Sequence, residues 1–315
     1  MFIRQKEVFI TMEYVLETNS LTKRYRNFTA LNGLSMHVPK GSIYGFIGRN
    51  GAGKTTLIRI VCGLQEPTEG SYSLYGIENA DSKVKRSRRR MGAVVEMPSI
   101  YLDMTARENL CHQYRVLKMP SDEGISDLLK LVGLENTGKK KAKNFSLGMR
   151  QRLGIALAIA GKPDFLVLDE PINGLDPQGI IEMRELILKL NREYGITVLI
   201  SSHILDELSR LATHYGFIDG GSMIKEMSAQ ELEMRCRKCI RVEVGNTKTL
   251  ARVLDEKKIE YSIVDNSKAD IYADVQTTKL VLALEKENCT VYSIKERDES
   301  LESFYMNLVG GERHE

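Results

Sequence analysis

Apolar residues in the first part of the chain gather in short runs that end at turn residues. Residues 14–17 and 34–38 have the length of strands, and residues 42–47, after a Pro-Lys-Gly turn, are almost continuously apolar. A run of this kind is typical of a strand buried on both faces. A glycine-rich loop follows, and the apolar positions of 55–64 then recur at helical spacing. The pattern predicts a buried strand, a loop and a helix in immediate succession.

The middle of the chain changes to helical periodicity. Three segments are expected to form a helical insertion between two parts of a sheet: 106–118, 122–132 and 148–160. Beyond them, apolar strands alternate with amphipathic helices, at 165–168, 178–194, 197–201 and 205–212. This alternation is typical of a parallel α/β core.

The character of the sequence changes again near Ser228. A charged helical stretch, 229–238, leads into alternating strands and helices of an α+β domain. The strands are expected at 240–244, 261–264, 271–275 and 290–294, and the helices at 247–257 and 278–287. We therefore expect a tail over 1–13, with Met12 as an alternative start, an α/β domain over 14–228 and a small accessory domain over 229–315.

Charge and composition exclude several protein classes. The 315 residues include 45 basic and 42 acidic ones, and a net charge of +3 is too small for strong binding of nucleic acid by charge alone. No apolar run approaches the roughly 18 to 20 residues that span a bilayer, and the first residues do not resemble a secretory signal. Five scattered cysteines do not indicate a disulfide framework. We expect a cytoplasmic location.

The glycine-rich loop matches the pattern G-x-x-x-x-G-K-[ST] between a strand and a helix, which is the context that gives the pattern meaning. Backbone N–H groups of such a loop surround an anion, Lys54 adds charge near the β- and γ-phosphates, and Thr55 supplies a hydroxyl to Mg²⁺. The alternative is a chance glycine-rich turn. The residues expected to bind ATP here are Gly48, Arg49, Asn50, Gly51, Ala52, Gly53, Lys54, Thr55 and Thr56.

Two carboxylates follow the apolar strand 165–168 directly. Asp169 and Glu170 therefore lie at the carboxyl edge of the predicted sheet, where α/β folds place their ligands. Asp169 is expected to hold Mg²⁺. Glu170 is expected to polarise an attacking water as a general base. The alternative is an ordinary strand end ahead of Pro171.

These motifs, in this order, make residues 14–228 resemble the ATP-binding cassette (ABC) family. The resemblance implies a P-loop nucleotide-binding domain with a helical insertion, ahead of the small α+β domain. Residues 144–152 look like the family signature, with Ser146 and Gly148 retained and Leu147 and Met149 departing from it. In the family this segment contacts the γ-phosphate held by the opposite subunit, which implies a homodimer.

Three more positions match family motifs. Asp176 lies in a segment similar to the D-loop, and His203 looks like the switch histidine that contacts the γ-phosphate and acts beside Lys54 and Glu170 in hydrolysis. Tyr25 matches the aromatic residue that stacks on adenine. Taken alone, a histidine after a strand is more often a bystander, and Tyr25 has the alternative of a surface residue in a turn.

One departure from the family pattern concerns the Q-loop, where a glutamine normally touches the metal and couples to the membrane partner. Residues 92–98 carry Glu96 at that place, which keeps an oxygen ligand and adds charge. The metal ligands implied are Thr55, Asp169 and Glu96. Together with neighbouring motifs, this departure makes the chain resemble the bacitracin and lantibiotic transporters.

The resemblance implies an ATP-binding and hydrolysing subunit of an exporter, which works as a dimer with a separate membrane permease at the inner face of the membrane. The alternatives are a soluble ABC ATPase that acts on ribosomes or nucleic acid, and a complex that senses an antibiotic. A nucleic-acid partner is not expected, because the basic stretch 83–90 lacks neighbouring aromatic residues and is interpreted as a solvated helix face. Cys236 and Cys239 form a single C-x-x-C, which is weak support for a metal site.

Overall fold

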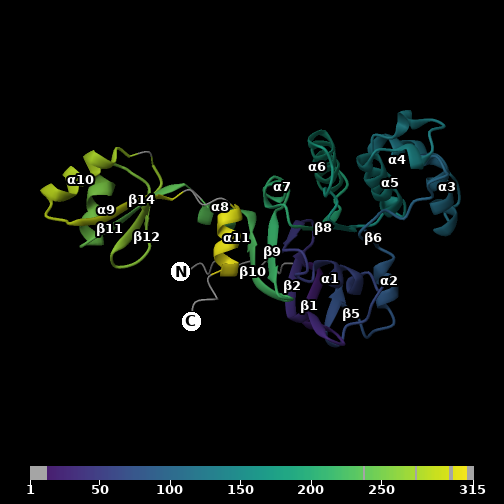
Figure 1. The fold of residues 1–315 in the computed structure, drawn as a ribbon, viewed down its shortest axis with the longest axis horizontal. Coiled ribbons are helices and arrows are strands. Elements are labelled where there is room, and N and C mark those ends of the chain that lie inside the picture. The colour runs from purple at the N-terminus through teal and green to yellow at the C-terminus, as the bar shows by residue number, and fades with distance from the viewer. Residues whose placement is uncertain (1–12, 237, 274, 298–300, 311–315) are drawn as a thin grey trace, which may run out of the picture. The chain divides into compact units, whose positions relative to one another are not determined.

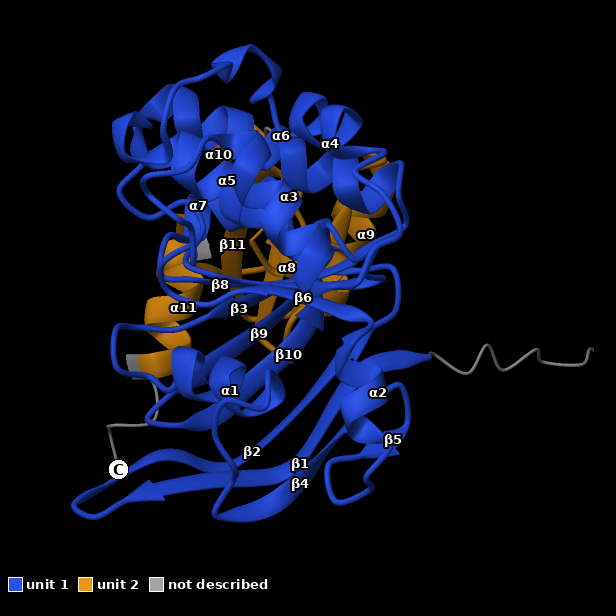
Figure 2. Ribbon diagram, turned by 90° about the vertical axis from the view of Figure 1, so that its right-hand side faces the viewer, with its two compact units in different colours: residues 1–229 blue, residues 230–315 orange. Residues whose placement is uncertain are grey.

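The computed structural model describes residues 13–236, 238–273, 275–297 and 301–310. Contacts divide the chain into a first unit, 1–229, and a second unit, 230–315 (Figure 2). The expected tail lies outside the described residues except for Glu13.

The centre of the first unit is a six-stranded sheet in the order β10-β9-β3-β8-β7-β6, and Figure 1 labels its strands β6, β8, β9 and β10. Its neighbouring strands are parallel, apart from β10, which runs antiparallel to β9. Every residue of β3, β7 and β8 is buried, in agreement with their apolar runs. The strands are β3 (Ile43–Ile47), β6 (Met91–Val94), β7 (Phe165–Asp169), β8 (Thr197–Ser202), β9 (His214–Asp219) and β10 (Ser222–Ser228). The α/β class with a parallel sheet is confirmed.

A second, antiparallel sheet of this unit has the order β2-β1-β4-β5. Its strands are β1 (Tyr14–Tyr25), β2 (Phe28–Pro39), β4 (Glu69–Leu74) and β5 (Ile77–Glu78). The predicted strands 14–17 and 34–38 were too short, because β1 and β2 continue through polar, exposed positions and several register shifts. Helix α1 (Lys54–Val61) shares a hydrophobic cluster with both sheets, for example through Leu57 and Ile58.

The helical insertion lies between β6 and β7, as predicted. Its main helices are α3 (Ala106–Val116), α4 (Ile125–Leu131) and α5 (Leu147–Ile159), which gather in one group in Figure 1. Helix α3 begins with a reciprocal capping box between Thr105 and Glu108, which satisfies two N–H groups that its first turn leaves without helical partners. Helix α6 (Pro177–Arg192) follows β7.

Three further predicted segments of the first unit need correction. Helix α1 ends at Val61 and not at the predicted 64, because the chain leaves the helix at Gly63, whose φ is 75°. Helix α7 (Leu205–Ser209) ends three residues before the predicted limit of 212, because the N–H of Thr213 already bonds to the Ile43 carbonyl at the start of the next strand. The basic stretch contains α2 (Val84–Arg88), and it is only partly a solvated face. Arg88 donates to the hydroxyl of Tyr72 and to the carbonyl of Val61.

The second unit contains an antiparallel sheet in the order β12-β13-β11-β14, and its β-α-β-β-α-β succession is that of a ferredoxin-like fold. Its elements are α8 (Ala229–Cys236, which starts in the first unit), β11 (Cys239–Val244), α9 (Thr247–Glu256), β12 (Tyr261–Ile263), β13 (Lys268–Ile271), α10 (Thr277–Lys286), β14 (Val291–Arg297) and α11 (Leu301–Gly310). The predicted strand 271–275 was wrong. Asp265 accepts from the N–H groups of Ser267 and Lys268, and this tight turn starts β13 earlier.

Candidate active site

The glycine-rich loop connects β3 to α1, and its backbone geometry requires glycine. Gly51 and Gly53 have φ values of 81° and 109°, in the left-handed region that favours glycine. A Cβ atom on Gly53 would lie 2.5 Å from the carbonyl oxygen of Ala30. The loop therefore holds its backbone close to β2 and leads directly into the N-terminus of α1, whose N-cap is Gly53.

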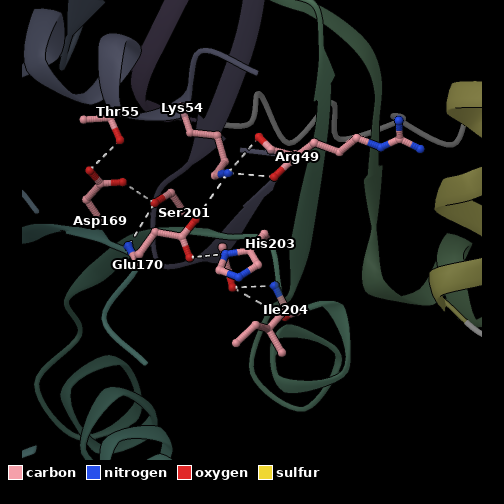
Figure 3. Close-up of polar contacts among 10 residues, drawn as sticks. Arg49, Lys54, Thr55, Asp169, Glu170, Ser201, His203 and Ile204 are labelled. Carbon is pink, nitrogen blue, oxygen red and sulfur yellow. Dashed lines mark hydrogen bonds and ion pairs between the residues drawn. The ribbon is translucent and has the colours of Figure 1, made fainter. Parts of the chain in front are cut away.

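The side chain of Lys54 lies inside this loop and is only 6% exposed. Its ammonium donates to the carbonyls of Gly48, at 2.6 Å, and Arg49, at 3.3 Å, and lies 3.2 Å from Oε1 of Glu170 (Figure 3). The side chain of Arg49 extends away from this cluster. A buried ammonium is costly unless it is compensated, so fixed carbonyl dipoles and one carboxylate hold this cation in place.

Asp169, the last residue of β7, is also almost fully buried. Its Oδ2 accepts from the hydroxyl of Thr55 at 2.8 Å, and its Oδ1 accepts from the hydroxyl of Ser201 on β8. The same Ser201 oxygen accepts the N–H of Glu170 at 3.0 Å. The hydroxyl and carboxylate oxygens of Thr55 and Asp169 thus converge, and such oxygens are the ligands that Mg²⁺ prefers. Sequence reasoning missed Ser201, although its register opposite Asp169 in parallel strands places it there.

Glu170 is held in an unusual backbone conformation between two basic side chains. Its φ is 50°, which is uncommon for a residue with a side chain. Oε1 faces Lys54, and Oε2 lies 2.8 Å from Nδ1 of His203. The structure therefore brings together the three residues that were predicted to be catalytic.

A cavity of about 230 Å³ opens over this cluster. Its lining residues are Phe28, Ala30, Asn50, Gly51, Gly53, Lys54, Thr55, Thr56, Glu170 and Asn173. Of the predicted loop residues, Gly48, Arg49 and Ala52 are not part of this lining. Tyr25 is also outside it, but its ring stacks on Phe28 at 5.5 Å between centroids and 14° between planes. Phe28, Ala30 and Asn173 were not predicted from the sequence.

The residues matched to the signature and the D-loop lie outside this lining. Ser146 caps α5 by accepting the N–H of Met149 at 3.2 Å, and Asp176 caps α6 by accepting the N–H of Gly179 at 3.2 Å. The two helix starts are neighbours, because a Cβ atom on Gly148 would lie 3.7 Å from a methyl carbon of Leu175.

Glu96 is likewise outside the cavity lining. Its φ is 60°, and its carboxylate forms an ion pair with Arg59 of α1. Elsewhere, the described residues contain no group of three His, Cys, Asp or Glu side chains that could hold a metal ion, so the Cys236–Cys239 pair gains no support as a metal site.

The chain is similar to known proteins over most of its length. The family model described as "ABC transporter" matches residues 31–173. Bacitracin transport ATP-binding protein BcrA of Bacillus licheniformis is 40% identical over 304 residues, or 95% of this chain and 99% of that protein. Lantibiotic transport ATP-binding protein SrtF of Streptococcus pyogenes is 44% identical over 212 residues, or 67% of this chain and 90% of that protein.

Solved structures agree with this result. The dimeric, post-hydrolysis ATP-binding cassette MJ0796, bound to ADP and Pi, matches with a TM-score of 0.61 at 25% identity, and the match covers 68% of this chain and 98% of that one. Across the part of the chain that the structure describes, no helix is both long and apolar enough to cross a membrane.

Proposed function

This chain belongs to the ABC transporter family and is an ATP-binding, ATP-hydrolysing subunit, and we propose that it powers an exporter of peptide antibiotics of the bacitracin or lantibiotic type. The two named relatives support the substrate class. The match to BcrA covers 95% of the chain, so it includes most of the second unit as well as the ATPase unit.

The contacts among Lys54, Glu170 and His203 carry the proposal for the site. The loop N–H groups and Lys54 bind the phosphates of ATP, because they combine a helix N-terminus with a full positive charge. Glu170 orients and polarises the attacking water. His203 holds the Glu170 carboxylate at Oε2, while Lys54 holds it at Oε1. Thr55 and Asp169 would hold Mg²⁺, which neutralises charge on the phosphate oxygens when it is bound.

Phe28 and Tyr25 form the proposed adenine platform. Phe28 is 58% exposed and Tyr25 is 39% exposed, so the stacked pair presents aromatic surface next to the phosphate cavity. An exposed flat ring beside a phosphate site can stack on a base. Phe28 lines the cavity itself, so we propose that it takes part with Tyr25 in binding the base.

Dimerisation explains why the signature residues are absent from the cavity of their own subunit. Ser146 is exposed, and it caps a helix whose N-terminus attracts anions. In a dimer, this surface would reach the ATP of the opposite subunit, with Asp176 beside it. The dimeric form of MJ0796 supports this assembly.

A groove next to Glu96 fits the proposed permease partner. This cavity of about 500 Å³, here called the Glu96 groove, lies between β6 and the helical insertion. Its lining includes Val95, Met97 and Pro98 from the loop, and Leu117 from the end of α3. Met97 and Leu117 are 72% and 41% exposed and line the same groove, and apolar surface gathered in one place in this way marks an interaction site. We propose that a cytoplasmic segment of a membrane permease covers it, which places this chain at the inner face of the membrane.

Co-purification from native membranes tests this function directly. The tagged chain should bring down a polytopic membrane protein, and ATPase activity of the complex should rise with bacitracin or a lantibiotic. The matched control is a chain in which Met97→Asp introduces a charge into the Glu96 groove. It should fold and hydrolyse ATP but lose the membrane partner. Recovery of ribosomes or nucleic acid in place of a membrane protein would contradict the proposal.

A further inference from the structure

Arg59 and Glu96 form an ion pair that connects α1 to the loop after β6. Both side chains remain partly exposed, at 36% and 54%. The residues are 37 positions apart, so the pair is a tertiary contact. One partner belongs to the helix that starts at the phosphate loop, and the other belongs to the loop that lines the Glu96 groove.

The position of Arg59 on α1 relates this pair to the predicted metal ligands. Thr55 and Arg59 are four residues apart in α1, and residues at this spacing lie on the same face of a helix, about 5–6 Å apart at Cβ. Thr55 donates to Asp169 at the place where oxygen ligands converge. The Glu96 carboxylate is therefore bound by a side chain that starts one helical turn after Thr55, on the same face of α1.

The loop that carries Glu96 is strained at this residue and borders the groove. Glu96 has a φ of 60°, a conformation that a side chain disfavours. The residues on either side of it, Val95 and Met97, line the Glu96 groove. A partner that fills the groove would contact both neighbours of Glu96 and shift the loop.

We propose that Arg59 is a positioning residue that holds Glu96 away from the metal site, so that Arg59 and the nucleotide-bound divalent cation compete for one carboxylate. This inference rests on the proposed function. It gives a physical reason for glutamate at this place, because a neutral glutamine would be held by Arg59 far more weakly than a carboxylate. Filling of the groove would shift Glu96 from Arg59 toward the metal, and thus connect permease contact to the nucleotide site.

Binding of Mn²⁺ in the presence of ADP, measured by electron paramagnetic resonance, tests the competition without relying on activity. An exposed ion pair contributes up to about 1 kcal/mol, so Arg59→Gln should tighten Mn²⁺ binding by up to about fivefold. In a Glu96→Gln background, Arg59→Gln should change nothing, because no carboxylate is then released. Arg59→Lys keeps the charge and should behave like the original chain. Arg192→Gln, in the last turn of α6, removes the same charge elsewhere and controls for general electrostatics.

The outcomes separate this inference from the proposed function. Unchanged or weaker Mn²⁺ binding in Arg59→Gln would overturn the competition, as would a tightening that persists in the Glu96→Gln background or appears equally in Arg192→Gln. If the original chain bound neither ADP nor Mn²⁺–ADP, the proposed function itself would fail. Unfolding midpoints of all variants exclude loss of folding as the cause of any change.

Discussion

Ser201→Ala is the substitution that tests the arrangement of the site most directly. The hydroxyl of Ser201 accepts the N–H of Glu170 and donates to the carboxylate of Asp169, so it fixes both residues at once. Ser201 is fully buried. In Ser201→Ala, the buried Oδ1 of Asp169 would lose this donor. The N–H of Glu170 would still donate to the backbone carbonyl of residue 201, at 3.2 Å.

The expected magnitude follows from these contacts. A hydrogen bond to a charged group contributes about 1.5–3 kcal/mol, and about 1 kcal/mol lowers the unfolding midpoint of a unit of this size by roughly 2–4 °C. We therefore expect a midpoint lower by about 3–12 °C. ATP turnover should fall by about tenfold or more, because small displacements of catalytic groups are costly.

Ser202→Ala is the matched control. Ser202 is equally buried, but among the described residues its hydroxyl forms hydrogen bonds only with the backbone of Ile204, at 2.9 Å and 3.5 Å. A neutral bond of this kind contributes about 0.5–1.5 kcal/mol. Differential scanning calorimetry and an ATPase assay on both variants check the prediction. Equal midpoints together with equal turnover in the two variants would refute the role of Ser201.

Other substitutions test separate parts of the site. Glu170→Gln should still bind ATP but hydrolyse it about 10²–10⁴-fold more slowly and accumulate as a dimer on size exclusion; turnover near that of the original chain would show that another group activates water. Phe28→Ala should weaken nucleotide binding by about 2- to 12-fold, as loss of about 0.5–1.5 kcal/mol of stacking requires, and calorimetric titration that finds unchanged affinity would remove Phe28 from the base site. Burial raises the pKa of Cys62 to about 12, so at pH 8 only about one thiol in 10⁴ is ionised. The Cys62 side chain is only half-buried, so iodoacetamide should modify it in the folded chain far more slowly than after unfolding; equally fast labelling of the folded and the unfolded chain would contradict the raised pKa.

The elements that carry the site were the most predictable from the sequence. The strands β3, β7 and β8 are buried on both faces and therefore appear as apolar runs, and the ends of such parallel strands meet at one edge. This is why the proximity of Lys54, Asp169 and Glu170 could be expected. Strands β4, β5, β6, β9 and β10 were not predicted. Most residues of β4, β5 and β10 are at least partly exposed, so their apolar pattern is weak, while β6 and β9 are short and each contains a glycine, which is depleted in strands.

The contacts that were missed arise from pairing between distant segments. Ser201 reaches Asp169 only through the register of β7 and β8. Phe28 reaches the phosphate cavity because β2 passes beside the loop, where Ala30 approaches Gly53. Arg59 was one of many basic residues in the sequence. Its importance depends on Glu96, whose place in the structure could not be obtained from periodicity or spacing.

The left-handed backbone of Glu170 has a consequence for engineering the protein. Such a conformation costs of order 1 kcal/mol for a residue with a side chain, whereas glycine adopts it freely. Glycine at this position would relieve that strain, but it would also remove the carboxylate that compensates the buried ammonium of Lys54. Thermostable versions of this ATPase must therefore gain their stability at other positions, since the strain of Glu170 cannot be released without losing both an ion pair and hydrolysis.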